Sequence, residues 1–188
     1  MLTLLEQQQR LLEILRGHAA DAGSAESNPD RAGLESDPWL GSVIRSPGLR
    51  ILRQTASWWQ RFQIESTCRY TSRLMKRQGC FEGYLDAHFA AHPAPPAIEE
   101  LAVEFLASLE EDKNPLLRAV AQFELFCMKS AQAPSRATTV LWDRNPEAVL
   151  LALERFQPLP DPEPGVRYLL RLKPAEPVSC LRESTREE

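Results

Sequence analysis

The sequence predicts a mainly α-helical protein, in which an N-terminal helical domain precedes a small α+β C-terminal module with a short antiparallel sheet. The first observation behind this fold class is that apolar residues recur at three- and four-residue spacing, between breaks at proline or glycine, up to Met128. The second is that β-branched and aromatic runs, separated by turn residues, follow Pro134. A chain of 188 residues that is 43% hydrophobic can bury a sizeable core.

The N-terminal end predicts an amphipathic helix over residues 1–17, because leucine and isoleucine recur at near-helical spacing before Gly17. Residues 18–37 are small, polar and punctuated by Gly, Ser, Asn and Pro, which is typical of a flexible linker. The apolar stripe of this helix is free to pack either on the rest of the chain or on a partner.

A helical domain is expected over residues 38–133. One helix begins near Asp37-Pro38 and a longer one after Ser46-Pro47, since Asp or Ser caps a helix and Pro suits its first turn. The longer segment continues to Gln78, as one helix or two in series, and ends at Gly79. Its apolar residues at three- and four-residue spacing are Leu49, Leu52, Ala56, Trp59 and Phe62.

Three further helices complete this domain. The first runs from Phe81 to Ala91 and stops before the rigid proline-rich break that begins at Pro93. The second carries a strong apolar stripe between Ile98 and Leu109, and the third begins at Asn114-Pro115 and continues as a mostly buried rod.

The C-terminal module is expected over residues 134–183, followed by a disordered tail at 184–188. Alternation and turn residues predict its elements in this order: a strand at Thr138–Trp142, a helix from Asn145-Pro146 through Arg155, a strand at Val166–Leu172 and a third strand between Pro177 and Arg182.

The chain contains no convincing catalytic set. It has no GxSxG turn and no glycine-rich phosphate loop, and neighbouring glutamates point in different directions from a helix. His88 and His92 share one helical face, but a closed metal site needs further ligands that the nearby sequence does not supply. We therefore expect no catalytic residue, metal site or cofactor here, and a metalloenzyme built on this histidine pair is only the third hypothesis.

Cysteine usage and hydropathy suggest a cytoplasmic protein. The four cysteines are widely spaced without a CxxC pair, so free and mostly buried thiols are expected. No apolar run approaches the roughly 18 residues that span a bilayer, and the N-terminus lacks the pattern of a signal peptide. We expect no membrane partner.

A basic segment lies within this acidic chain of net charge -4. Residues 45–77 contain eight Lys and Arg residues but the single acid Glu65. Arg69, Arg73 and Arg77 recur every four residues and form one stripe, which is a candidate partner-binding surface, although solvated surface arginines are an equal alternative. We do not expect nucleic acid as a partner, because the chain is acidic overall and shows no clear helix-turn-helix pair.

The predicted sheet is a candidate peptide-binding site. A small sheet with a free edge accepts an extended peptide by strand addition, whereas a sheet that simply covers the helical body is the equal alternative. The candidate peptide-binding residues are Val140, Trp142, Tyr168, Leu169, Leu170 and Arg171.

Several segments together resemble a known family. They are the Leu-rich first helix, RYTSRLMKRQGCFEGYLDAHFAAHP, AVEFLASL, NPLLRAVAQFELF and WDRNPEAVLLALE. This order resembles the HvfC/BufC-like (MbnC/TglI-type) partner proteins of multinuclear-iron TIM-barrel enzymes that modify ribosomally made peptides. The likeness covers Arg69 to Leu172 and rests on aromatic, Leu and Glu positions such as Phe81, Phe105, Phe123, Glu124, Trp142 and Pro146.

The resemblance implies a non-catalytic subunit that forms a heterodimer with the TIM-barrel iron enzyme. It also implies that the C-terminal module recognises the leader of a precursor peptide during cysteine-directed modification, with strand addition as one mode. The iron and the oxidation chemistry would belong to the enzyme. Members of this family have also been described as DNA-binding, so a transcriptional regulator using the basic 45–77 face is the alternative.

Overall fold

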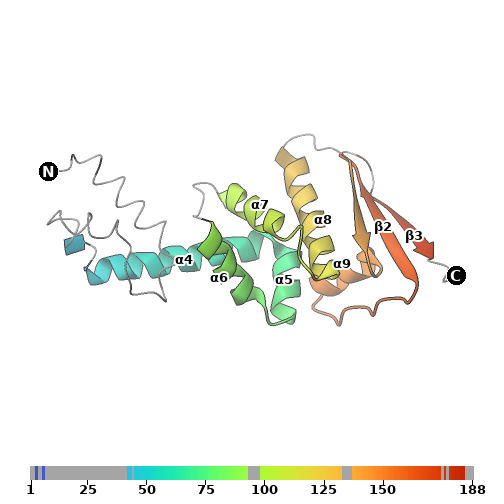
Figure 1. Ribbon diagram of the computed structural model, residues 1–188, viewed down its shortest axis with the longest axis horizontal. Coiled ribbons are helices and arrows are strands. Elements are labelled where there is room, and N and C mark those ends of the chain that lie inside the picture. The colour runs from blue at the N-terminus through green and yellow to red at the C-terminus, as the bar shows by residue number, and fades with distance from the viewer. Residues whose placement is uncertain are drawn as a thin grey trace. The chain divides into compact units, whose positions relative to one another are not determined.

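The computed structural model describes residues 3, 6, 42–43, 45–92, 98–132, 137–174, 176 and 178–184. Within these residues the protein is mainly helical with a small antiparallel sheet near the C-terminal end, so the predicted fold class is confirmed (Figure 1). The predicted N-terminal helix, the linker and the helix start near Asp37-Pro38 lie outside the described residues, apart from residues 3 and 6.

Each helix expected after Ser46 is present, and every end that the sequence predicted is met within one residue. The helices are α4 (Pro47–Thr67), α5 (Arg69–Arg77), α6 (Phe81–Ala91), α7 (Ile98–Ser108), α8 (Pro115–Gln132) and α9 (Pro146–Glu154). The long segment after Ser46 is two helices in series, because Cys68 leaves the helical conformation with φ -93° and ψ 62°. Gly79 follows α5 with φ 69°, a left-handed conformation that glycine adopts without strain.

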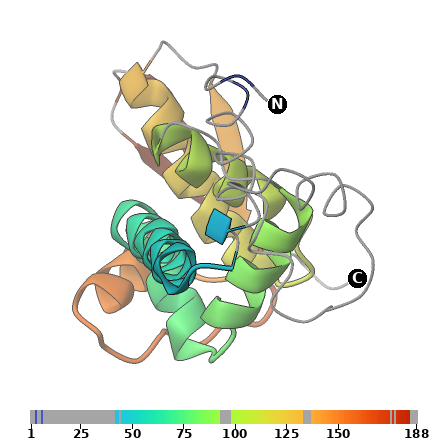
Figure 2. The ribbon, with the colours of Figure 1, turned by 90° about the vertical axis from the view of Figure 1, so that its left-hand side faces the viewer.

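The described residues form two compact units. The first contains α4 up to Gln63 and α6 from Glu82 onward, and Figure 2 looks nearly along the axis of α4. The second contains Ile64–Phe81 and the described residues from Ile98 onward. Helices α5, α7 and α8 therefore share a unit with the sheet, so this division does not coincide with the boundary predicted at residue 134.

The core of the second unit surrounds α8, which contacts α5, α7 and β1, while α5 also contacts α9. Phe105 of α7, Leu117 of α8 and Trp142 of β1 are fully buried in it. Large apolar side chains buried to this degree supply most of the driving force for folding.

The sheet has the order β1-β2-β3, with both pairs antiparallel. Its strands are β1 (Thr138–Trp142), β2 (Val166–Leu172) and β3 (Ser179–Ser184). The third strand is shifted two residues toward the C-terminus from its predicted start and end, so Ser184 belongs to β3 and not to the tail. Leu170 lies opposite both Val140 and Cys180, and these three side chains share the face turned toward the helices.

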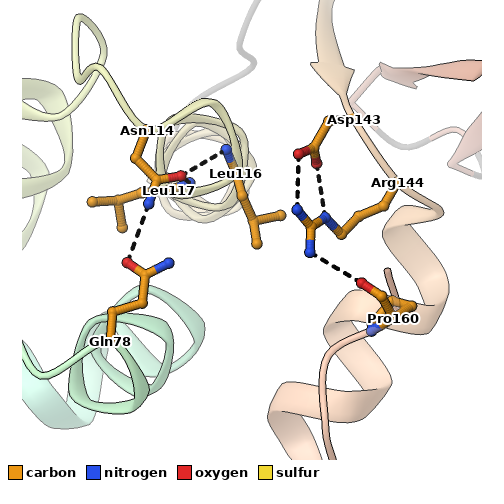
Figure 3. A network of polar contacts seen from close by, with 7 residues as sticks. All are labelled: Gln78, Asn114, Leu116, Leu117, Asp143, Arg144 and Pro160. Atoms are coloured by element: carbon orange, nitrogen blue, oxygen red, sulfur yellow. Dashed lines mark hydrogen bonds and ion pairs between the residues drawn. The ribbon is translucent and has the colours of Figure 1, made fainter. Parts of the chain in front are cut away.

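Figure 3 shows polar contacts at the start of α8 and in the segment between β1 and α9. The Asn114 Oδ1 atom accepts hydrogen bonds from the N–H groups of Leu116 and Leu117 at 3.1 and 3.2 Å, and its amide donates to Gln78 at 3.2 Å. Asn114 therefore caps α8 and joins it to the end of α5. The Arg144 guanidinium bonds both carboxylate oxygens of Asp143, and donates at 3.0 Å to the carbonyl oxygen of Pro160 in the loop after α9.

Replacing Asn114 by alanine is expected to lower the free energy of unfolding by about 1 kcal/mol, because the first turn of α8 loses its side-chain acceptor. Asn114→Asp keeps that acceptor and loses only the bond to Gln78, so its expected loss is under about 0.5 kcal/mol. Urea denaturation of both variants measures the difference. Equal losses would show that the contact with Gln78, and not the cap, carries the effect.

Candidate peptide-binding site

The arginine stripe lies at the C-terminal end of α9. The Arg73 guanidinium donates to the carbonyl oxygens of Leu153 and Glu154, at 3.1 and 3.0 Å. The same group lies 4.3 Å from the centre of the Phe156 ring, a residue whose φ of 56° ends the helix. The last carbonyls of a helix lack intrahelical partners and attract cations, so this contact stabilises α9.

The other two arginines of the stripe contact the same region. Arg77 donates to the carbonyl oxygen of Gln157, and Arg69 forms an ion pair with Glu154 at 3.3 Å. Half of the Arg69 side chain remains exposed. The stripe thus has a structural role within the chain, and its contact with a partner stays a prediction.

Other cations of the basic segment are also paired. Arg61 binds the carboxylates of Glu82 and Asp86, and Lys76 binds that of Glu65. With the arginine stripe, at least five of the eight basic residues in 45–77 have carboxylate or carbonyl partners. Fewer cations are therefore available for the phosphate contacts that a DNA-binding face requires.

The predicted peptide-binding residues divide between the two faces of the sheet. The side chains of Val140, Trp142, Tyr168 and Leu170 are buried on the helix-facing side. Leu169 and Arg171 point to the opposite face, because neighbouring residues of a strand alternate in direction. Most of the predicted residues thus belong to the core that anchors the sheet.

A groove of about 410 Å³ lies on the helix-facing side, between β3 and α9. Leu170 is the sequence-predicted residue among its lining residues. The lining residues are Tyr70 of α5, Phe123 of α8, Pro146, Glu147, Leu150, Leu151 and Glu154 of α9, Leu170 of β2, and Val178 and Cys180 at β3. Most of these side chains are apolar, and the volume lies within the range of ligand pockets.

Sequence reasoning missed the α9 side of this groove, although α9 carries a signal for it. Val149, Ala152 and Leu153 form its buried face. Leu150 and Leu151 are additional apolar residues outside that face, and Leu151 is 40% exposed. A helix with more apolar residues than its own core needs is a sign of a second contact surface.

Two carboxylates border the groove along α9. Glu154 pairs with Arg69, whereas no ion pair of the Glu147 side chain is found among the described residues. Although Cys180 is exposed as a residue, partial desolvation raises the pKa of its thiol, and the nearby charge of Glu147 raises it further. The Glu147 end of the groove is therefore electronegative.

The strand beside the groove has an open edge. All six residues of β3 are exposed, and in the part of the chain that the structure describes β3 pairs with β2 alone. Glu163 links β3 to β2, since its carboxylate accepts hydrogen bonds from the Tyr168 hydroxyl of β2 and from Arg182 of β3. An exposed edge presents unpaired N–H and C=O groups, which are a template for another strand.

A second surface, the aromatic patch, lies on α4. Trp58, Trp59 and Phe62 are 59%, 51% and 46% exposed, and the rings of Trp58 and Phe62 stack with centroids 5.5 Å apart. Their neighbours Ile51 and Leu52 are exposed as well. Apolar side chains grouped in this way are typical of a protein-binding surface.

The cysteines correct the expectation that most thiols are buried. All four thiols are free, but Cys127 and Cys180 are exposed, so the expectation of mostly buried thiols was wrong for half of them. The rings of His88 and His92 stack with centroids 4.9 Å apart. Within the described ranges, no three His, Cys, Asp or Glu side chains are grouped as metal ligands would be.

No helix in the described part of the chain has the length and apolar character needed to cross a membrane.

Comparisons with protein-family models, curated proteins and solved structures return no match. The class of protein that fold and groove define is thus a mainly helical protein with a groove beside an open sheet edge.

Proposed function

We propose that this chain is a non-catalytic cytoplasmic subunit that recognises the leader of a ribosomally made precursor peptide for a multinuclear-iron TIM-barrel enzyme. The observation that supports this most directly is the open edge of β3 beside an apolar groove. A peptide that pairs with β3 gains backbone hydrogen bonds, and its alternate side chains enter the groove. The resemblance over Arg69 to Leu172 supplies the class of peptide and of enzyme, and the iron would belong to that enzyme.

The aromatic patch on α4 is the surface that we assign to the enzyme. Trp and Tyr anchors dominate the energetics of many protein interfaces, and exposed stacked rings need no rearrangement before binding. The exposed half of Arg69 offers a second contact for an acidic enzyme surface. The subunit would thus bind enzyme and peptide through different parts of its chain.

Co-expression with an iron enzyme encoded beside this chain is expected to give a stable heterodimer. Replacing both Trp58 and Trp59 by alanine is expected to weaken the complex at least 30-fold, because hot-spot residues contribute about 2 kcal/mol or more. Both side chains are more than half exposed, so the fold should survive. Calorimetry on the purified proteins measures the affinity.

Leu141→Ala is the matched control, since Leu141 is an exposed apolar residue on the outer face of the sheet. Its affinity for the enzyme should stay within twofold of the wild type. A chain that remains monomeric beside the enzyme would overturn the proposed function. A heterodimer insensitive to the tryptophan substitutions would overturn only the assignment of the aromatic patch.

A further inference from the structure

We propose that the groove selects a peptide strand with one large apolar side chain and a Lys or Arg two positions away, whose cationic end pairs with Glu147. This inference rests on the proposed function and specifies the chemistry of the peptide. Residues two apart on a strand point to the same face and lie roughly 7 Å apart. A single strand next to β3 can therefore present both side chains to the groove.

The apolar preference follows from the middle of the groove. Leu150 and Leu151 form its floor on α9, Tyr70 and Phe123 form a wall, and Val178 is 57% exposed at its border. The two aromatic rings contact each other edge to face, with centroids 6.3 Å apart, so this wall is already assembled. A Leu, Ile, Val or Phe side chain would cover these surfaces and exclude water from them.

The cationic preference follows from the ends of the groove. Glu147 and Glu154 lie seven residues apart on α9, which corresponds to roughly 10 Å along the helix. Arg69 already neutralises Glu154, at 3.3 Å. Glu147 is therefore the carboxylate toward which the added cation should point. Its separation from Leu150 and Leu151 along α9 is close to the two-residue spacing of a strand.

A second copy of this chain fits the groove poorly. The β3 side chains on the groove face are those of Cys180, Arg182 and Ser184, because Cys180 and Arg182 lie opposite Leu170 and Tyr168. Within β3 itself no large apolar side chain lies on this face, so pairing of β3 with another β3 would place only Cys180, Arg182 and Ser184 beside the groove. The charges of Arg182 and Glu183 also disfavour self-pairing of an edge strand.

Selection of a displayed library of random twelve-residue peptides on the full-length chain tests this inference. We expect enrichment of a large apolar residue with Lys or Arg two positions away. In an enriched peptide, replacing the apolar residue by alanine should weaken binding 10- to 30-fold, and replacing the cation by glutamate at least fivefold. Bound peptide should also slow maleimide labelling of Cys180 at least tenfold, while labelling of the exposed Cys127 stays unchanged.

A charge exchange provides the sharper readout. Glu147→Lys should reject the Lys peptide and bind its Glu counterpart, whereas Glu147→Gln should lose the charge preference without gaining a new one. Leu150→Asp should weaken all enriched peptides, and Leu141→Asp on the outer face should weaken none. Circular dichroism of each variant confirms that the fold is kept.

The outcomes separate the two proposals. Peptides that bind at β3 without the apolar and cationic preference would overturn this inference and leave the proposed function intact. A library with no binder at all would overturn the proposed peptide recognition, and this inference with it. A β3-mediated dimer, seen by sedimentation and not displaced by enriched peptide, would overturn this inference in favour of self-association.

Discussion

Replacing Glu124 by alanine is expected to lower the free energy of unfolding by about 3 kcal/mol. Glu124 is a buried carboxylate on α8 that accepts hydrogen bonds from the backbone N–H groups of Tyr70 and Thr71, at 2.7 and 2.8 Å. These N–H groups belong to the first turn of α5, where Cys68 makes no side-chain cap. Glu124 therefore caps α5 from another helix, and alanine would leave two donors without an acceptor.

Two opposing effects act on the pKa of Glu124. Burial raises the pKa of its carboxyl group, while the hydrogen bonds from Thr71 and Tyr70 oppose that shift. Glu124→Gln keeps one oxygen acceptor and should lose about half as much stability as Glu124→Ala. Urea denaturation compares both with Glu104→Ala, whose exposed carboxylate should contribute less than about 0.5 kcal/mol. A loss below about 1 kcal/mol for Glu124→Ala would contradict the capping role.

Acidification from pH 7.5 to 4 is expected to destabilise the protein through His88, by at most roughly 3 kcal/mol. Burial, with a smaller contribution from the charge of His92, lowers the pKa of His88 from 6.5 to about 4. Below pH 6.5 the unfolded chain takes up a proton at this residue, whereas the folded chain does not until about pH 4. The stability therefore falls across this interval and becomes independent of His88 below it.

His88→Leu is the variant that isolates this effect, because leucine suits a buried site and does not titrate. Carboxylates titrate over part of the same interval in both proteins, so the quantity to compare is the difference in unfolding free energy between wild type and variant at each pH. That difference should shift in favour of His88→Leu as the pH falls. His92→Leu, at an exposed position, should keep most of the wild-type dependence, and parallel curves for wild type and His88→Leu would refute the assignment.

Local sequence signals predicted the elements well, because each depends on a few neighbouring residues. Asn145 and Pro146 begin α9 as expected, with the Asn145 side chain accepting from the N–H groups of Glu147 and Ala148. Gly79 ends the α5 segment for a backbone reason that is independent of the rest of the fold. The third strand was shifted by two residues, since its uniform exposure leaves no alternation to mark its ends.

The candidate site was less predictable, because it joins residues from separate elements. The sequence indicated which side chains of β2 alternate, but not that Tyr168 and Leu170 would face helices while Leu169 faces outward. The arginine stripe was correctly regular along its helix, yet its regularity could not show that Arg73 would meet the carbonyl end of α9, some 80 residues later.

The sequence alone predicted a mainly helical chain, the order of the described helices and strands, the N-terminal caps of α4, α8 and α9, and the lack of any familiar catalytic motif. The tertiary structure decided the groove between α9 and β3, the cap that Glu124 provides for α5, and the exposure of the aromatic patch on α4. The physical reason is that spacing along a chain sets the direction of a side chain relative to its own element. Which other element then covers that side chain, or leaves it open, depends on packing between distant segments.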